Sequence, residues 1–456
     1  MRRTELKEHP SPGASTHGRH GGDGRVGDGP RSAEAVDADV VGAVEDTLRA
    51  VLRGRAAEAA AVDPLFAEDV ARRVVDFTLD GGKRIRPRFL WWGMRAAGGH
   101  TRTTTRAALR VAAAVELIQT CALIHDDVMD ASPLRRGAPS VHADLQDQYP
   151  DPDPTAGRVG PSFGTSAAVL AGDLALAWAD DVLAETVQAE PHRHRVLEIW
   201  RSMRTEMVAG QYLDLHGQAN GSRSVARAIR IACLKSALYT VERPLALGAA
   251  LAGADARTTE ALCSAGRCAG IAFQLRDDLV GVFGDPRASG KPCGEDIRDG
   301  KLTYLVAVAT ARAEARGDSG TLALLRGALG DPELTPERFE RVRAALVDTG
   351  ARATVETRIE RLVAQGTRHL ARVPAPPHVT DRLIRLFGAA AGTGSTTPTT
   401  APPPHAISSP LAPPPHAISS SPAPPPHATS SPPAPPPAPP PAHDRATTDF
   451  GPGDAR

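Results

Sequence analysis

Two clusters of aspartates interrupt apolar stretches of the sequence, and their side chains are the strongest candidates for chemistry. The first cluster, at residues 126–130, reads Asp-Asp-Val-Met-Asp. The second cluster begins with Asp277 and Asp278. Aspartate is rarely buried unless it is paired with a cation or binds a metal. Two such clusters facing each other would form a site for divalent cations and, through them, for phosphate groups.

Spacing within the first cluster favours a metal site. If residues 126–130 are helical, Asp126 and Asp130 lie on one face, where their like charges repel unless a divalent cation binds both. Carboxylate oxygens without histidine or cysteine suit Mg²⁺, with Mn²⁺ as an alternative ion. Asp127 points elsewhere and is expected to support the site indirectly. A solvated acidic helix end is the competing interpretation, and the apolar run before the cluster disfavours it.

The second cluster offers one metal ligand. The next acidic residue on the helical face of Asp277 is Asp285, two turns away and about 12 Å along the axis, at about 1.5 Å per residue. A single ion cannot bridge that separation. We therefore expect Asp277 to bind metal and Asp278 to support it.

Basic residues near the two clusters are candidates for phosphate binding. A glycine turn at residues 81–82 precedes Lys83 and Arg86, and Arg135 and Arg136 follow the first cluster by one loop. Lysine and arginine neutralise phosphate, and glycine allows close approach of the backbone. A single basic residue is more often solvated, but the aspartate clusters favour phosphate binding here. Further candidates are Lys235, Lys291 and Lys301.

Helices are predicted to position these residues. Ala and Leu dominate the middle of the chain, apolar residues recur every three or four positions, and strand-like alternation is absent. We expect one all-α domain at residues 34–392. The predicted helices span residues 36–61, 64–79, 86–97, 104–130, 166–189, 193–216, 225–253, 257–283, 301–316, 335–347, 351–371 and 379–390.

Both ends of the chain are predicted to be disordered. Residues 1–33 are rich in Gly, His, Arg and Ser, and residues 393–456 are mostly Pro, Ala, Ser, Thr and His. In the second segment, residues 401–409 recur with a period of 11 residues at 412–420 and 423–431. This repeat is either a polyproline II spacer or a multivalent tag that docks the protein to a scaffold, a partner enzyme or a protein shell.

Composition argues against several classes of protein. The formal net charge is zero, unlike that of a general nucleic-acid or membrane-surface binder. Five cysteines without a CxxC pair fit free thiols in a cytoplasmic protein. The N-terminus lacks the apolar run of a secretory signal. We expect no transmembrane segment, because no unbroken run of about 18 apolar residues occurs.

Short motifs follow one another in a fixed order along the chain. They lie at residues 81–87, 116–119, 126–130, 135–137, 172–173, 210–214, 235–236, 273–274, 277–278, 284–285 and 290–291. Together they closely resemble the trans-isoprenyl diphosphate synthases, or polyprenyl synthetases, and above all the bacterial short-chain members that make geranylgeranyl diphosphate. The resemblance covers about residues 45–390. It implies a helical bundle of the isoprenoid synthase type around a central active-site cavity, and a homodimer.

The resemblance also implies a reaction. Family members join isopentenyl diphosphate to an allylic diphosphate (dimethylallyl, geranyl or farnesyl), whose diphosphate leaves with the help of three Mg²⁺ ions. Asp126 and Asp130 would hold two ions, and Asp277 the third. The residues implied in substrate binding are Arg135, Lys235 and Lys291 for the allylic diphosphate, Gln274 beside the allylic cation, and Lys83, Arg86, Gln119 and Arg136 for isopentenyl diphosphate.

Two positions depart from the family pattern. Gly281 stands where many members have a third Asp in the second cluster, and Ser236 stands where Thr is common. Ser236 keeps the hydroxyl group. We expect the glycine to tune the third metal and not to abolish activity, because Asp277 and Asp278 remain.

Product length is expected to depend on the residues one turn before the first cluster. Cys121 and Ala122 would face the tunnel into which the product grows, and their small size would let it pass C15. We expect C20, with C25 or longer as the alternative. A competing interpretation is that Cys121 and Ala122 are merely small core residues. The deeper floor is expected to involve Leu117, Ile118, Trp91, Trp92 and residues 166–170.

Two other functions compete with this one. An all-helical terpene cyclase also ionises a diphosphate at an aspartate cluster, but it would not need Lys83, Arg86 and Arg136. A non-catalytic modifying subunit of a prenyl synthase would lose the first cluster or these basic residues, and the chain retains both.

Overall fold

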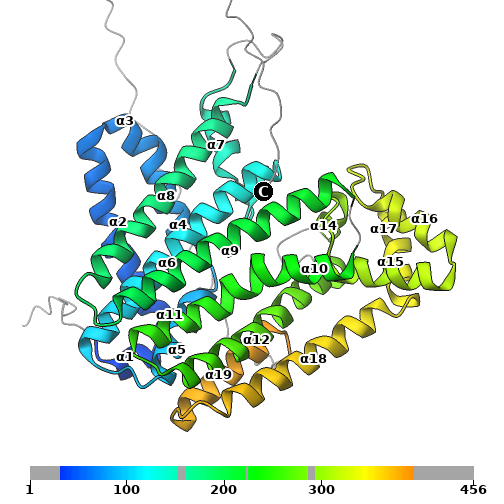
Figure 1. The fold of residues 1–456 in the computed structure, drawn as a ribbon. Coiled ribbons are helices and arrows are strands. Elements are labelled where there is room, and N and C mark those ends of the chain that lie inside the picture. The colour runs from blue at the N-terminus through cyan, green and yellow to red at the C-terminus, as the bar shows by residue number, and fades with distance from the viewer. Residues whose placement is uncertain (1–30, 152–159, 222–223, 286–292, 394–456) are drawn as a thin grey trace, which may run out of the picture. The chain divides into compact units, whose positions relative to one another are not determined.

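The computed structural model describes residues 31–151, 160–221, 224–285 and 293–393, and most of these residues are helical (Figure 1). The predicted all-α class is therefore confirmed. Lys291 and the C-terminal repeats lie outside the described residues. The first elements are α1 (Ala33–Ala38), α2 (Val40–Val62), α3 (Pro64–Phe66), η1 (Ala67–Ala71), α4 (Arg72–Leu79), α5 (Ile85–Ala96) and α6 (Arg102–Met129).

The middle and the end of the described chain are also helical, apart from one short hairpin. The middle elements are β1 (Leu134–Arg135), β2 (Ala138–Pro139), α7 (Val141–Gln148), α8 (Phe163–Val187), α9 (Arg193–Ala219), α10 (Val225–Ile231), η2 (Ala232–Glu242), α11 (Arg243–Leu251) and α12 (Ala256–Phe283). The last elements are α14 (Glu295–Arg298), α15 (Tyr304–Arg316), α16 (Ser319–Ala328), α17 (Pro336–Asp348), α18 (Ala351–Leu370) and α19 (Pro377–Ala390).

Helix α6 leads from the core to the first aspartate cluster. It starts after Thr101, whose hydroxyl oxygen accepts a hydrogen bond from the Thr104 backbone N–H at 3.1 Å, a typical N-cap. Its main packing partner is α8. A Cβ at Gly172 of α8 would lie only 2.1 Å from the ring Nε2 of His125, so glycine is what permits this approach.

Helix α6 is also the one helix in the described residues that is long and apolar enough to cross a bilayer, although it contains no unbroken apolar run of that length. Most of its apolar window is buried by neighbouring helices, as is usual for a core helix. Buried apolar residues around it belong to the larger of two core clusters. The smaller cluster lies among α12, α15, α17 and α18.

Several features of the fold differ from the predicted helices. The segment predicted as one helix at 225–253 contains η2, eleven residues of π-helix between α10 and α11. Strands β1 and β2 pair antiparallel through a two-residue turn, in which Arg136 and Gly137 have φ angles of 55° and 83°. Two positive φ values are typical of the tight turns that join such strands. Helices α7 and α16 were not predicted either.

Candidate active site

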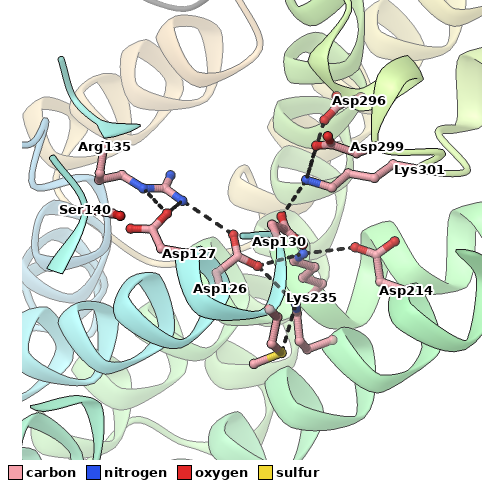
Figure 2. Close-up of polar contacts among 12 residues, drawn as sticks. Asp126, Asp127, Asp130, Arg135, Ser140, Asp214, Lys235, Asp296, Asp299 and Lys301 are labelled. Atoms are coloured by element: carbon pink, nitrogen blue, oxygen red, sulfur yellow. Dashed lines mark hydrogen bonds and ion pairs between the residues drawn. The ribbon is translucent and has the colours of Figure 1, made fainter. Parts of the chain in front are cut away.

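The first aspartate of the first cluster meets two side chains from facing helices. Asp126, in the last turn of α6, accepts a hydrogen bond from Lys235 Nζ of η2 at 3.3 Å (Figure 2). It also accepts one from Gln211 Nε2 of α9 at 3.0 Å. Burial alone would raise the pKa of Asp126, but the positive charges of Lys235, Lys301 and Arg135 outweigh burial and lower it. Asp126 is therefore an anion among cations.

Lys235 reaches Asp126 because α9 and η2 are in close contact. A Cβ at Gly210 would lie 2.5 Å from the Lys235 backbone nitrogen, so a larger residue would push the two helices apart. Lys235 Nζ also donates to Asp214 of α9 at 2.9 Å. Its ammonium group is thus held between two carboxylates from different helices, as Figure 2 shows. Long π-helical segments such as η2 are rare and often mark functional sites.

Asp130 follows the last residue of α6 and binds a different lysine. Its Oδ2 accepts a hydrogen bond from Lys301 Nζ at 2.7 Å. Lys301 also lies 3.2 Å from Asp299 and 4.0 Å from Asp296 (Figure 2). Although burial opposes it, this acidic surrounding raises the pKa of Lys301, which stays charged. Asp126 and Asp130 are consequently neutralised by separate cations, one from η2 and one from the segment before α15.

Asp127 is turned into the protein. Its carboxylate is buried and accepts a hydrogen bond from Arg135 Nε of β1 at 2.8 Å. Burial raises the pKa of Asp127, and Arg135 partly opposes this rise. The pair anchors the β1–β2 hairpin to α6, with a terminal nitrogen of Arg135 3.7 Å from Asp126. Arg135, predicted to bind a diphosphate, therefore stands beside the site with Asp127 as its support.

The second cluster divides less sharply, because both of its aspartates border one cavity. Asp277 borders a polar cavity of about 290 Å³ together with Asp126, Lys235 and Lys301. Asp278 is buried and accepts hydrogen bonds from the amide of Gln274 at 2.9 Å and from the backbone N–H of Tyr304 at 3.3 Å. Burial raises the pKa of Asp278 to about 7. Gln274, predicted to lie beside a cation, also borders the polar cavity.

Asp296 of α14 lies where the second cluster lacks its third carboxylate. A Cβ at Gly281 would be 3.3 Å from Asp296 Oδ2. Asp296 also borders the polar cavity with Asp277. Sequence patterns do not predict this proximity, because Gly281 of α12 and Asp296 of α14 belong to different helices.

A second, apolar cavity of about 420 Å³ adjoins the polar one. The two cavities share Arg86, Asp126, Lys235 and Ser236 as lining residues. Both predicted product-length residues, Cys121 and Ala122, line the apolar cavity; other lining residues include Ile118, Leu123, Leu176, Met207 and Val208. Burial raises the pKa of Cys121 to about 12, so this thiol is neutral and acts as a small apolar group.

The predicted floor of the cavity is partly wrong. Trp91 turns to the other side of α5 and donates its indole N–H to Asp37 of α1 at 2.8 Å. Trp92 and residues 166–170 do not line the apolar cavity either, and Leu170 is 61% exposed. Arg204 of α9 lines it instead and forms an ion pair with Asp180 of α8. Which side chains of α5 and α8 face the cavity depends on how the helices pack, and periodicity alone does not determine this.

The four residues predicted to bind isopentenyl diphosphate fall into two groups. Arg86 lies 4.6 Å from the ring centre of Tyr239 and donates to Thr240 Oγ1 at 3.0 Å. Gln119 lines the apolar cavity with Arg86, and its buried Oε1 has no hydrogen-bond partner among the described residues.

Arg136 and Lys83 form the second group, at the glycine turn before α5. A Cβ at Gly82 would lie 3.7 Å from an Arg136 nitrogen, and the Arg136 guanidinium lies 5.4 Å from the ring centre of Phe77. Lys83 is exposed in the same turn. Arg136 borders a different cavity from that of Arg86 and Gln119.

Several residues of the site were not singled out from the sequence. Gln211 and Asp214 were noted only as part of a motif, and their lysine and aspartate partners come from other helices. No sequence pattern marked Tyr239, Thr240 or Asp296 as part of the site. The available clue was the spacing of Gln211 and Asp214. Side chains three residues apart on a helix lie on the same face, so both can reach the same neighbour.

The donor set at the two clusters fits a divalent cation. The carboxylates that face the polar cavity offer only oxygen atoms, as Mg²⁺ prefers. Within the described residues, no three acidic, histidine or cysteine side chains converge closely enough to enclose an ion by themselves. An open arrangement suits Mg²⁺, which keeps waters and binds substrate phosphates along with one or two carboxylates.

Comparison with known proteins identifies the family. The family model for polyprenyl synthetases matches residues 68–333, more than half of the chain. The chain belongs to the polyprenyl synthetase family. As the motifs predicted, it is a prenyltransferase that makes polyprenyl diphosphates.

Relatives of this polyprenyl synthetase differ in the product that they are named for. Geranylfarnesyl diphosphate synthase of Aeropyrum pernix is 31% identical over 67% of this chain and 88% of the relative. Farnesyl diphosphate synthase of Mycobacterium tuberculosis is 30% identical over 65% of this chain and 75% of the relative. The solved geranylgeranyl pyrophosphate synthase of Corynebacterium glutamicum, complexed with isoprenyl diphosphate and magnesium, is 39% identical. Its TM-score is 0.71, with coverage of 77% of this chain and 98% of that one.

Proposed function

We propose that this polyprenyl synthetase condenses isopentenyl diphosphate with an allylic diphosphate to give C20 geranylgeranyl diphosphate. The observation that carries the proposal is the junction of the two cavities at Asp126 and Lys235. One cavity is lined by charged groups suited to diphosphates, and the other is apolar and suited to a hydrocarbon chain. An allylic diphosphate lying across the junction would place its reacting carbon between them.

Residues that line the polar cavity, together with Asp127, Asp130 and Arg135 of the first cluster and its hairpin, are assigned to binding and leaving-group stabilisation. Asp126, Asp130 and Asp277 would hold three Mg²⁺ ions, with Asp127 and Asp278 in support. Bound metal would supply positive charge that stabilises the departing diphosphate. Lys235, Lys301 and Arg135 add charges fixed by their acidic neighbours, so they need little reorganisation to stabilise developing negative charge.

Isopentenyl diphosphate is assigned to the region around the start of α5. Arg86 and Gln119 line the cavity that meets the reacting carbon, and Lys83 and Arg136 lie at the glycine turn nearby. A diphosphate spanning the two groups would turn the isopentenyl double bond toward the allylic carbon. The apolar walls would keep water away from the carbocation until the new carbon–carbon bond forms.

The C20 product is supported by the shape of the apolar cavity. Ala122 and Cys121 add little volume to its wall, so a C15 chain is not stopped one turn behind Asp126. The Arg204–Asp180 ion pair at another wall offers a charged boundary that a hydrocarbon would not pass easily. Relatives named for C15, C20 and C25 products show that family membership leaves the length open.

Product analysis tests this function directly. The full chain is incubated with Mg²⁺, isopentenyl diphosphate and, in turn, dimethylallyl, geranyl or farnesyl diphosphate, and products are identified by mass. We expect a C20 diphosphate from all three primers. A hydrocarbon product would indicate a terpene cyclase, and absence of turnover by the isolated chain would indicate a modifying subunit.

We also propose a cytoplasmic homodimer. All five cysteines are free in the structure, as in a reducing compartment. Exposed apolar side chains on α8, namely Phe163, Val169 and Leu170, suit burial against a second subunit. Light scattering of the purified chain should give twice the chain mass. Leu170→Glu should shift the mass toward the monomer, while Val347→Glu, at another exposed apolar position, should leave it unchanged.

The C-terminal repeats are proposed to dock the enzyme to a scaffold or protein shell. Support comes from the three copies of one short motif, which would raise binding strength through effective concentration. Deletion of residues 393–456 should leave kcat and KM of the purified enzyme nearly unchanged but release it from its assembly. A large loss of kcat on deletion would contradict the docking role.

A further inference from the structure

A groove between α15 and α18 carries three arginines on its walls. Its volume is about 700 Å³, and the arginines are Arg312, Arg358 and Arg361. Thr357 and Gln365 bring further hydrogen-bond donors to the same space, and the lining residues include no carboxylate. The groove is separate from the substrate cavities except at Tyr304, which borders both the groove and the polar cavity.

The positive charges of the groove are not neutralised within the described part of the chain. Arg312 donates to the carbonyl oxygen of Thr349 at 3.0 Å, and Arg358 donates to the hydroxyl of Tyr304 at 3.0 Å. Arg361 has no hydrogen bond or ion pair with any described residue. Three guanidinium groups around one groove repel each other, and an anion with several oxygens would remove that repulsion while accepting hydrogen bonds from each.

Tyr304 connects the groove to the second aspartate cluster. Its ring centre lies 5.0 Å from the Arg358 guanidinium, and its hydroxyl accepts the Arg358 hydrogen bond. Its backbone N–H donates to Asp278 Oδ2 at 3.3 Å. An anion that draws Arg358 into the groove would therefore act on the residue that holds Asp278, next to the proposed metal ligand Asp277.

We propose that this groove is a second anion site, which binds a diphosphate group, and that Tyr304 transmits its occupancy to the second aspartate cluster. The group could come from inorganic pyrophosphate or from the head of a prenyl diphosphate, and both present the same oxygens to the arginines. The proposal goes beyond the condensation reaction, because binding in the groove requires no turnover.

Calorimetry with the full chain tests the site. Titrations in EDTA use inorganic pyrophosphate and decyl diphosphate, which has a saturated chain and cannot ionise as an allylic substrate does. Arg361→Gln removes one exposed charge, and Arg368→Gln is the matched control on the same helix, outside the groove. We expect Arg361→Gln to weaken groove binding about tenfold or more, as loss of a charged hydrogen bond does. Arg361→Lys should restore part of the affinity, and Arg368→Gln should match the wild type.

The two ligands distinguish the source of the diphosphate. Tighter binding of decyl diphosphate, lost in Arg361→Gln, supports a prenyl diphosphate, and equal or tighter binding of pyrophosphate supports the free anion. Unchanged affinity of Arg361→Gln for both ligands would overturn the anion site. A chain without synthase activity could still show the groove binding, so this outcome is separate from the proposed function.

Hydrogen exchange tests the link through Tyr304. Pyrophosphate should slow exchange of the Tyr304 amide in the wild type and in Arg368→Gln, but much less in Arg361→Gln, whose active-site residues are intact. Equal slowing in all three proteins would show that the effect comes from the active site alone and would overturn the coupling.

Discussion

The two aspartate clusters follow the same plan up to their third position and then differ. In each pair the first aspartate, Asp126 or Asp277, borders the polar cavity, and the second, Asp127 or Asp278, is buried. Asp278 borders the cavity as well, whereas Asp127 does not. Asp127 is balanced by the charge of Arg135, whereas Asp278 accepts hydrogen bonds from an amide and a backbone N–H. A repeated sequence pattern therefore gives similar burial of the second aspartate but two different electrostatic environments.

The third position separates the clusters further. Asp130, directly after α6, supplies a carboxylate and binds Lys301, whereas Gly281 supplies none and Asp296 of α14 lies beside it. Only the first cluster also borders the apolar cavity, through Asp126. The first cluster thus connects diphosphate binding with product length, and the second serves the polar cavity alone.

Removing a cavity-facing carboxylate should have the largest effect. Asp126→Asn and Asp277→Asn each remove a proposed Mg²⁺ ligand, and we expect kcat to fall about 10³-fold in each case, comparable to loss of a major electrostatic contact in other enzymes. Asp147→Asn, at an exposed position of α7, is the control and should keep wild-type kcat. Turnover is measured at saturating Mg²⁺. A near-normal rate for either cluster variant would show that its carboxylate is not a metal ligand.

A bulky residue behind the first cluster should change the product. Ala122→Phe adds a ring at the wall of the apolar cavity, so elongation should stop at C15 and farnesyl diphosphate should accumulate. Val280→Phe adds the same ring beside the second cluster, at a partly exposed position outside both substrate cavities, and should leave the C20 product unchanged. Mass analysis of the product mixture reports both results. Continued C20 synthesis by Ala122→Phe would mean that the chain grows in another direction.

The buried aspartates should differ in stability. Asp127→Asn leaves Arg135 without its charged partner and should lower the free energy of unfolding by about 3 kcal/mol, as for other broken buried pairs. Asp278→Asn should cost less than about 1 kcal/mol near pH 6, where Asp278 is largely neutral because its pKa is about 7. Both free energies come from urea unfolding in EDTA, and equal losses would remove the contrast between the clusters.

The pH dependence of unfolding gives a second measure of Asp278. Its folded pKa of about 7 lies above the ordinary aspartate value of 3.8, so the folded state binds more protons between these values. Stability contributed by this group is therefore present below pH 3.8 and is lost as pH rises toward 7. Asp278→Asn should flatten the decline in unfolding free energy across this window, compared with the wild type.

Much of the fold and the cavity-facing aspartates could be predicted from the sequence, because both depend on the pattern of apolar and acidic residues along single helices. Apolar periodicity located α6 within two residues at its start, and its end placed Asp126 and Asp130 near one another. The π-helix η2 was not predictable, since it depends on how α9 and α12 pack around it. The same is true of Tyr304 beside Asp278 and of Asp296 beside Gly281, which join residues far apart in the chain.

The substitution with the smallest expected effect tests whether Asp296 takes the place of the missing third carboxylate. Gly281→Asp restores the family pattern but puts a second carboxylate next to Asp296, whose Oδ2 lies only 3.3 Å from the position of the new Cβ. Like charges at this distance repel, so we expect kcat/KM to fall about threefold, equivalent to less than about 1 kcal/mol. Asp296→Asn alone should also lower kcat/KM, and the double variant should recover most of the loss, because it again has one carboxylate there. If Gly281→Asp raised activity with Asp296 unchanged, the two positions would act independently.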